Sequence, residues 1–218
     1  MKERGILFSA PMVRALLAGT KTQTRRLVKP PPTHFVGGPG VIDSHGKPVP
    51  RAPAVDDGVS SREIVCPYGV PGDRLWVRET WAHHVQAQAA ARDEDGPFVY
   101  AADGPSALQH RLQGKWTPGI HMFRWASRIT LELTGVRVER LQDISEADAW
   151  AEGCVRGTLD DNGDPFPAEE PHPSGVGMRG WDTARDWYAD LWEEINGAGS
   201  WDTNPWVWAL AFQRVEMS

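Results

Sequence analysis

The chain has 218 residues, of which 40% are apolar and 24% are charged, and its formal net charge is −6. This composition is typical of a soluble globular protein long enough for one large domain. The negative charge argues against a protein that mainly coats duplex nucleic acid, because such proteins neutralise phosphates with a basic surface. A local basic patch that holds one nucleotide or one RNA end stays compatible with this charge.

The cysteine spacing and the lengths of the apolar runs bear on metal binding, on a signal peptide and on membrane spans. Cys66 and Cys154 belong to no C-x-x-C or histidine-spaced pattern, so neither a metal site nor a cofactor is expected. The N-terminus lacks the apolar core of a signal peptide, and no apolar run approaches the roughly 18 residues that span a bilayer. We therefore expect a cytoplasmic protein without a membrane partner, and a monomer by default.

The first predicted elements are a short strand at residues 6–8 and a helix from Pro11 to Ala18. Proline suits the first turn of a helix, and Gly19 is a typical stop. Residues 22–27 then have a composition that favours a strand. Residues 28–72 are rich in proline and glycine and predict a long irregular insertion.

Residues 74–81 predict a strand that carries a carboxylate on its apolar face. Leu75, Val77 and Glu79 share this face by alternation. A carboxylate there fits the mouth of a barrel, where the core opens into a cleft, and it equally fits a salt bridge from Glu79 to a neighbouring arginine. Residues 98–101 predict another short strand.

The C-terminal half mixes strands and helices. Residues 127–141 predict a long strand with a bulge at Gly135, followed by a helix that Ser145 caps and Gly153 ends. A second irregular insertion, at residues 155–180, precedes an amphipathic helix over 183–195 and a buried strand over 206–215. Together these elements favour an α+β fold, a β-barrel with flanking helices.

The loop from Gly19 to Arg26 is chemically the most distinctive stretch. It places a lysine, threonine hydroxyls and two arginines within eight residues. Such a cluster fits a site for a polar small molecule, and the alternative is a solvated turn with a basic edge.

Three motifs together resemble the ASCH domain family, whose fold is a PUA-like β-barrel. They are Gly-x-Lys-x-x-x-x-Arg at residues 19–26, Gly-Asp-x-Leu-x-Val at residues 72–77, and a helix that ends in Glu152-Gly153. Residues 21–26, 72–79, 124–128 and 204–208 look most like phage and prophage members. The resemblance implies one ASCH domain over residues 1–218, with the two insertions at 28–72 and 155–180.

Some ASCH proteins are amidohydrolases that remove acyl groups from the exocyclic nitrogen of cytosine nucleosides, such as N4-acetylcytidine. The resemblance implies that Lys21, Thr24 and Glu152 are catalytic here. Amide cleavage needs an activated oxygen nucleophile, a stabilised oxyanion and a proton for the leaving amine. Lys21 could activate Thr24 only with a lowered pKa, and Glu152 could hold Lys21, activate water or protonate the amine. Residues three apart point to opposite faces of a strand, so we expect irregular backbone between Lys21 and Thr24.

Four further residues are candidates for substrate binding. Arg26 would suit the pyrimidine O2, and its alternative is an ion pair with Asp73 or Glu79. Ser9 would contact the base or serve as a helix N-cap. Arg78 and Glu79 are weaker candidates for lining the pocket. His83 and His84 have no partner motif and are interpreted as surface or loop histidines.

The leading hypothesis is therefore hydrolysis of a small modified nucleoside. The alternative is a PUA-like module that binds RNA or a modified base without catalysis, although the negative net charge weighs against strong polyanion binding. A nuclease is the third possibility, and lysine with threonine offers little for phosphodiester cleavage.

Overall fold

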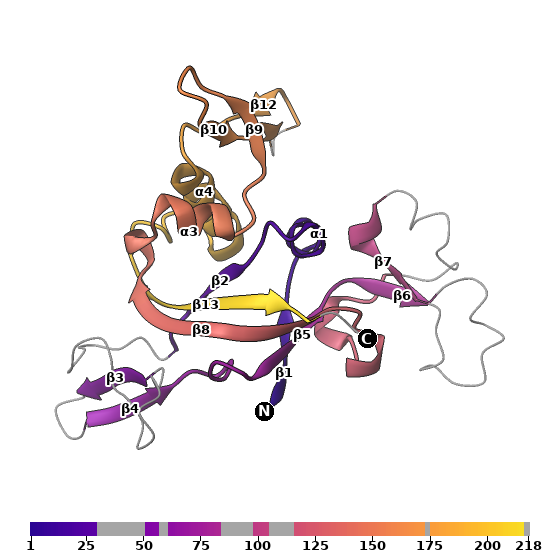
Figure 1. The fold of residues 1–218 in the computed structure, drawn as a ribbon, viewed down its shortest axis with the longest axis vertical. Helices are drawn as coiled ribbons and strands as arrows, with labels where there is room; N and C mark the ends of the chain where they lie inside the picture. Colours follow the sequence, from indigo (N-terminus) through magenta and orange to yellow (C-terminus); the bar gives the residue numbers. More distant parts are fainter. Residues whose placement is uncertain (30–50, 57–60, 84–97, 105–115, 173–174, 216–218) are drawn as a thin grey trace.

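The fold is described by a computed structural model, which places residues 1–29, 51–56, 61–83, 98–104, 116–172 and 175–215. It is a mixed α+β fold built on a curved five-stranded sheet (Figure 1). The strand order is β1-β5-β8-β13-β2, and the strands span Glu3–Leu7, Arg74–Arg78, Thr130–Arg140, Trp206–Arg214 and Gln23–Leu27. Strands β1 and β5 run parallel, and the other neighbours run antiparallel.

The sheet ends at β1 on one side and at β2 on the other. The predicted α+β class with a mostly β core is confirmed, while no backbone ladder closes a barrel among the placed residues. A side chain links the two edges, because the Arg26 guanidinium on β2 donates a 2.6 Å hydrogen bond to the carbonyl of Leu7 on β1.

The core lies where apolar strands meet the helices. Residues 207–210 of β13 are all buried, as their unbroken apolar run predicted. The register of β8 against β13 shifts between Ala211 and Phe212, next to Gly135, and this confirms the predicted bulge. A second, smaller cluster joins Trp81, Tyr100, Met122 and Ala126.

The predicted helices are present with their expected ends. Helix α1 spans Ala10–Ala18 and stops at Gly19, and α3 spans Glu146–Ala151 and starts at Ser145, whose hydroxyl accepts the Asp148 N–H. Helix α4 spans Ala184–Asn196, with Thr183 as the N-cap. The spacing of Trp187, Leu191 and Ile195 places them along one side of α4, where Trp187 is buried and Ile195 is 62% exposed. The short 3-10 helices are η3 Ala101–Asp103, η4 Gly119–His121, η5 Arg124–Ala126 and η6 Leu141–Asp143.

The two insertions predicted as irregular contain strands, so that part of the prediction is wrong. In the first, β3 (Arg51–Asp56) pairs with β4 (Ser61–Val65); residues 30–50 and 57–60 of this insertion lie outside the described ranges. In the second, β9 (Arg156–Leu159) pairs with β10 (Pro165–Pro167), and β11 (Glu170–Pro171) pairs with β12 (Met178–Arg179).

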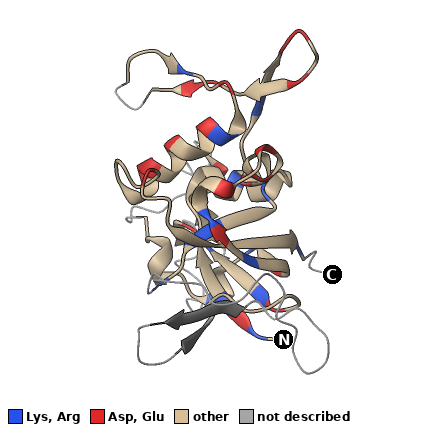
Figure 2. Ribbon diagram, turned by 90° about the vertical axis from the view of Figure 1, so that its left-hand side faces the viewer, with Lys and Arg blue, Asp and Glu red and all other residues tan. Residues whose placement is uncertain are grey.

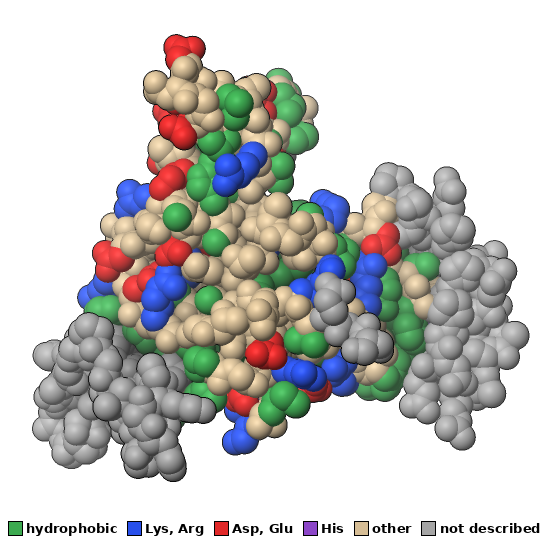
Figure 3. Space-filling view, in the orientation of Figure 1, with side chains coloured by type: hydrophobic (Ala, Val, Ile, Leu, Met, Phe, Trp, Pro, Cys, Tyr) green, Lys and Arg blue, Asp and Glu red, His purple; other side chains and the backbone are tan. Residues whose placement is uncertain are grey.

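The second insertion forms an arm, defined as residues 156–179. Its first turn is ordered by Asp160, whose side chain accepts the backbone N–H groups of Asn162 and Asp164, each at 2.8 Å. The arm stands clear of the body (Figure 3), and acidic residues gather on it and on α4 (Figure 2). An Asp- and Gly-rich composition thus forms tight turns here.

The strand predicted over residues 74–81 is shorter than expected and ends at Arg78. The chain then enters β6 (Trp81–His83), which pairs with β7 (Phe98–Tyr100) beside the smaller core cluster. Within the described ranges, no helix combines the length and the apolar character needed to cross a bilayer.

Candidate functional site

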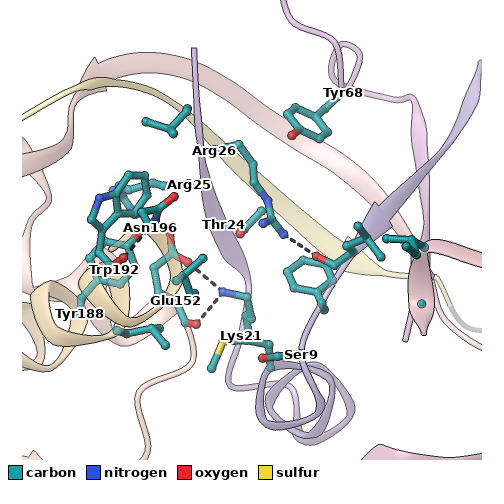
Figure 4. A pocket seen from close by; sticks show the side chains of 18 of the residues that line it. Ser9, Lys21, Thr24, Arg25, Arg26, Tyr68, Glu152, Tyr188, Trp192 and Asn196 are labelled. Carbon is teal, nitrogen blue, oxygen red and sulfur yellow. Dashed lines mark hydrogen bonds and ion pairs between the residues drawn. The ribbon is translucent and has the colours of Figure 1, made fainter. Parts of the chain in front are cut away.

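A cavity of about 640 Å³ opens between α1, β2 and α4 (Figure 4). Its volume is in the range of pockets that bind small molecules. It combines apolar walls with a small set of polar and charged side chains, which are Ser9, Lys21, Thr24, Arg25, Arg26, Lys29, Tyr68, Thr80, Glu152, Tyr188 and Asn196.

Lys21 is held at this cavity by the end of α3. Its ammonium donates to the Glu152 carboxylate at 2.8 Å and to the Glu152 carbonyl at 2.6 Å. The two residues also form an isolated antiparallel bridge, and the N–H of Thr22 donates to the carbonyl of Ala151 at 2.8 Å. Lys21 is only 4% exposed. A buried ion pair therefore joins the loop after α1 to the C-terminus of α3.

Lys21 and Thr24 converge on the cavity because regular strand geometry begins after Lys21. Strand β2 starts at Gln23, and Lys21 precedes it in an isolated bridge, so the expected irregular backbone is present. Thr24 is 5% exposed and lines the cavity with Lys21. No hydrogen bond joins its hydroxyl to another residue that the structure describes.

The carboxylate of Glu152 is shared between two cations. Its Oε2 accepts from Lys21, and its Oε1 accepts from Arg25 Nη1 at 3.0 Å. Glu152 lies at the C-cap of α3, where the helix dipole disfavours a negative charge. The two cations offset this cost. With both oxygens occupied, the geometry favours holding Lys21 over the other two roles considered for Glu152.

Arg25 is the centre of a buried charge network. Its guanidinium is shielded from solvent and also donates to Glu139 at 2.7 Å and to Asp148 at 3.0 Å. Gln23 donates to Asp148 at 2.7 Å as well. Each of the three carboxylates that surround Arg25 therefore accepts a charge-assisted hydrogen bond from it.

The position of Lys21 changes its proton affinity. Burial lowers the pKa of the Lys21 ammonium below its usual value, since a charge is costly to remove from water. Glu152 opposes this shift, whereas Arg26 and Arg25 add to it by repulsion. A lysine with a lowered pKa has the character that a general base requires.

Arg26 and Ser9 lie at the cavity as predicted. Arg26 places its guanidinium 5.2 Å from the centre of the Phe8 ring and makes no ion pair with Asp73 or Glu79, its proposed alternative partners. Those two carboxylates pair with Arg4 and Arg128 instead. Ser9 occupies the N-cap position of α1, but its hydroxyl makes no capping bond. Both side chains are thus available to a ligand.

The predicted substrate-binding roles of Arg78 and Glu79 need correction. Neither side chain is among those that line the cavity. Glu79 forms a two-point ion pair with Arg128, at 2.9 and 3.0 Å, which is the salt-bridge alternative. Arg78 donates to the carbonyls of Gly119 and Ile120, two residues that line the cavity, so it holds this segment of the wall.

The wall that α4 contributes to the cavity was not predicted from the sequence. Tyr188, Trp192 and Asn196 follow at four-residue spacing and all line the cavity. The indole N–H of Trp192 is buried and has no acceptor among the described residues. The amphipathic pattern of this helix predicted its apolar face. It did not indicate that this face borders a cavity as well as the core.

His83 is not among the residues that line this cavity. His83 is half-buried, 5.3 Å from the ring of Trp81 and 5.4 Å from that of Phe98, and His84 lies outside the described residues. Within the described ranges, no three side chains of His, Cys, Asp and Glu are grouped so that they could ligate a metal ion.

Comparison with models of protein families, with curated proteins and with solved structures finds no match to this chain.

Proposed function

We propose that this protein is an amidohydrolase that removes acyl groups from N4 of acylated cytosine nucleosides. The observation that carries the proposal is the buried Lys21–Glu152 ion pair, which lines one cavity together with Thr24. The resemblance to ASCH amidohydrolases assigns catalysis to these three residues. The proposal includes the PUA-like barrel form of the sheet and a cytoplasmic, monomeric protein.

In the proposed reaction, Thr24 is the nucleophile and neutral Lys21 is the base. The Thr24 oxygen bonds to the acyl carbon while its proton passes to the Lys21 amine. The C–N bond then breaks, and Lys21 returns the proton to N4, which leaves as the amino group of cytosine. Water next cleaves the Thr24 ester and releases the carboxylic acid and the free hydroxyl.

The remaining walls suit a flat, polar base. Arg26 offers a fixed donor to the pyrimidine O2, and it is held in place by the Leu7 carbonyl and the Phe8 ring. Tyr188 and Trp192 on α4 provide aromatic surface across the cavity. A small modified nucleoside is thus the substrate class that these side chains favour.

The test is a spectrophotometric assay with N4-acetylcytidine, its deoxy counterpart and longer N4-acyl analogues. Deacylation changes the absorbance of the base, so turnover is read directly. We expect turnover by the wild-type chain and a decrease in kcat/KM of about 10²–10⁴ in Thr24→Val. Absence of turnover with every substrate would overturn the proposed reaction.

Thr22→Val is the matched control. Thr22 is an exposed threonine in the same loop, and it does not line the cavity. We expect this variant to retain the wild-type rate. Full activity in Thr24→Val would leave the reaction in place but exclude Thr24 as the nucleophile.

A second candidate function is binding of a modified base within RNA, without catalysis. Arg26 and Lys29 line the cavity, and no ion pair joins either of them to another described residue. Cations in this state attract phosphate. Salt-dependent binding of RNA, measured by fluorescence anisotropy and accompanied by no turnover, would favour this function.

A further inference from the structure

Arg25 competes with Lys21 for one carboxylate. The Glu152 oxygens are divided between them, at 3.0 Å to Arg25 Nη1 and 2.8 Å to Lys21 Nζ. All three side chains are buried, with exposures of 3%, 4% and 2% for Arg25, Lys21 and Glu152. At such low exposure the charge on each side chain acts strongly on the other two.

We infer that Arg25 is a positioning residue that keeps Lys21 able to act as a base. This inference rests on the proposed function, and it adds a residue that the ASCH resemblance does not assign. Arg25 holds Glu152 in place through one oxygen and withdraws part of its negative charge from Lys21. A lysine that alone faced a buried glutamate would hold its proton more tightly.

Arg25 is able to do this because it is anchored on its other side. Glu139 on β8 and Asp148 on α3 each bind its guanidinium, and Arg137 binds both of these carboxylates. Arg25 therefore stays charged and fixed while it shares Glu152. The charged and titratable groups around the Lys21–Glu152 pair are Arg25 and Arg26 from β2, Tyr188 from α4, Asp148 from α3, and Arg137 and Glu139 from β8.

Two substitutions should change the proton affinity of Lys21 in opposite directions. Arg25→Gln removes a positive charge from beside Lys21, so the pH at which activity appears should move up by about one unit or more. Glu139→Gln removes a negative charge that offsets Arg25. The pH at which activity appears, which is the acidic limb of the pH profile, should therefore move down by about a few tenths of a unit. Arg25→Lys keeps the charge and should shift the limb less than Arg25→Gln.

The experiment measures kcat/KM against pH from about 5 to 10.5 for the wild type and these three variants, with folding checked by circular dichroism. Opposite shifts in Arg25→Gln and Glu139→Gln support the inference. A purely structural role for Arg25 would lower activity in both variants and leave the limb where it is, which would overturn it. If Arg25→Gln does not fold, Glu139→Gln still decides, because the absence of a downward shift in that variant would overturn the inference.

A direct titration separates this inference from the proposed reaction. Lysine labelled with ¹³C at Cε reports its own protonation by NMR, and Lys21→Met identifies the Lys21 signal. The chain has few lysines to resolve, namely Lys2, Lys21, Lys29, Lys47 and Lys115. If no acylcytosine is turned over and the Lys21 titration still shifts in opposite directions, the reaction is wrong and the role of Arg25 stands. An unchanged titration in Arg25→Gln and Glu139→Gln overturns that role.

Discussion

Several opposing effects act on the Lys21 ammonium. Their balance decides whether this buried lysine is charged, as in a structural ion pair, or neutral, as a base must be. Burial favours its neutral form, the Glu152 carboxylate favours its charged form, and Arg25 and Arg26 repel it. The same ion pair thus joins α3 to the loop before β2 and holds the lysine that acts as the base in the proposed reaction. Thr24, which lines the same cavity, keeps a hydroxyl without a partner among the described residues.

Replacing Lys21 by methionine tests the chemical role at this scale. Methionine keeps much of the apolar side chain but removes the base, so kcat/KM should fall by about 10²–10⁴. Circular dichroism and the thermal midpoint check that the fold persists. Lys2→Met, at an exposed position near the start of β1, is the control and should keep the wild-type rate. Equal activity in both variants would exclude Lys21 as the base.

At the scale of secondary-structure elements, the end of α3 and the turn that follows it place the site residues. Helix α3 ends at Ala151, directly before Glu152, which binds Lys21, and Gly153 then turns the chain away with φ of 103°. A Cβ on this glycine would lie 3.0 Å from the Cβ of Ala15 and 3.2 Å from that of Lys21. The turn after α3 and the loop after α1 are therefore packed together without room for a side chain.

Gly153→Ala should impair both stability and activity. The left-handed backbone costs an alanine about 1–2 kcal/mol, and the new methyl group pushes on Lys21. Gly163→Ala is matched to it, since Gly163 has φ of 87° and no atom lies within 4 Å of its added Cβ. Urea denaturation should show the larger loss of stability in Gly153→Ala, because Gly163 lies on the arm, and the deacylation assay should show a loss of rate only in Gly153→Ala. Equal rates would contradict this packing.

Asp73 ties the start of β1 to the start of β5. Burial would raise the pKa of Asp73, but the N–H of Lys2, at 2.7 Å, and the guanidinium of Arg4, at 3.1 Å, together lower it below 3.8. The unfolded chain therefore binds this proton more readily. The stability that Asp73 contributes is present above pH 3.8 and is lost as the pH falls through its folded pKa.

Asp73→Asn should lower the thermal midpoint at neutral pH and flatten its dependence on pH in acid. The midpoint is measured in steps below pH 5 by differential scanning calorimetry. Asp161→Asn, at an exposed position on the arm, is the control and should follow the wild-type curve. An Asp73→Asn curve parallel to the wild type would show that this carboxylate does not link the two strands energetically.

At the scale of the whole molecule, the sheet and its helices form the core, and the arm projects from it (Figure 1). Polar contacts attach the arm to α4. The indole N–H of Trp187 donates to the Glu170 carboxylate at 3.2 Å, and Arg179 forms an ion pair with Glu194 at 2.6 Å. Apolar arm residues such as Leu159 are largely exposed. Stability should therefore depend on the core far more than on the arm.

The same substitution, leucine to alanine, can be made in the core at Leu210 and on the arm at Leu159. Leu210 on β13 is 0% exposed, so truncation should cost about 2–5 kcal/mol. Leu159 is 66% exposed, and its truncation should stay within about 0.5 kcal/mol. Chemical denaturation gives both free energies of unfolding. Similar losses would show that the arm folds as part of the core.

Local patterns in the sequence were enough to predict the α+β class, the helices with Ser145 as a cap, the bulge at Gly135 and the cluster of polar groups between Gly19 and Arg26. These features depend on neighbours in the chain, through periodicity, capping and turn preferences. The prediction of irregular insertions was wrong because Gly- and Asp-rich segments favour tight turns between short strands as well as loops.

Only the tertiary structure decided which side chains meet. Glu152 lies 131 residues from Lys21 in sequence, and Arg25 binds Glu139 across 114 residues. Tertiary packing also pairs Glu79 with Arg128 and places one face of α4 at the cavity. The sequence thus determined the groups available, and folding determined their partners, because charge sharing and burial depend on distances that no local pattern encodes.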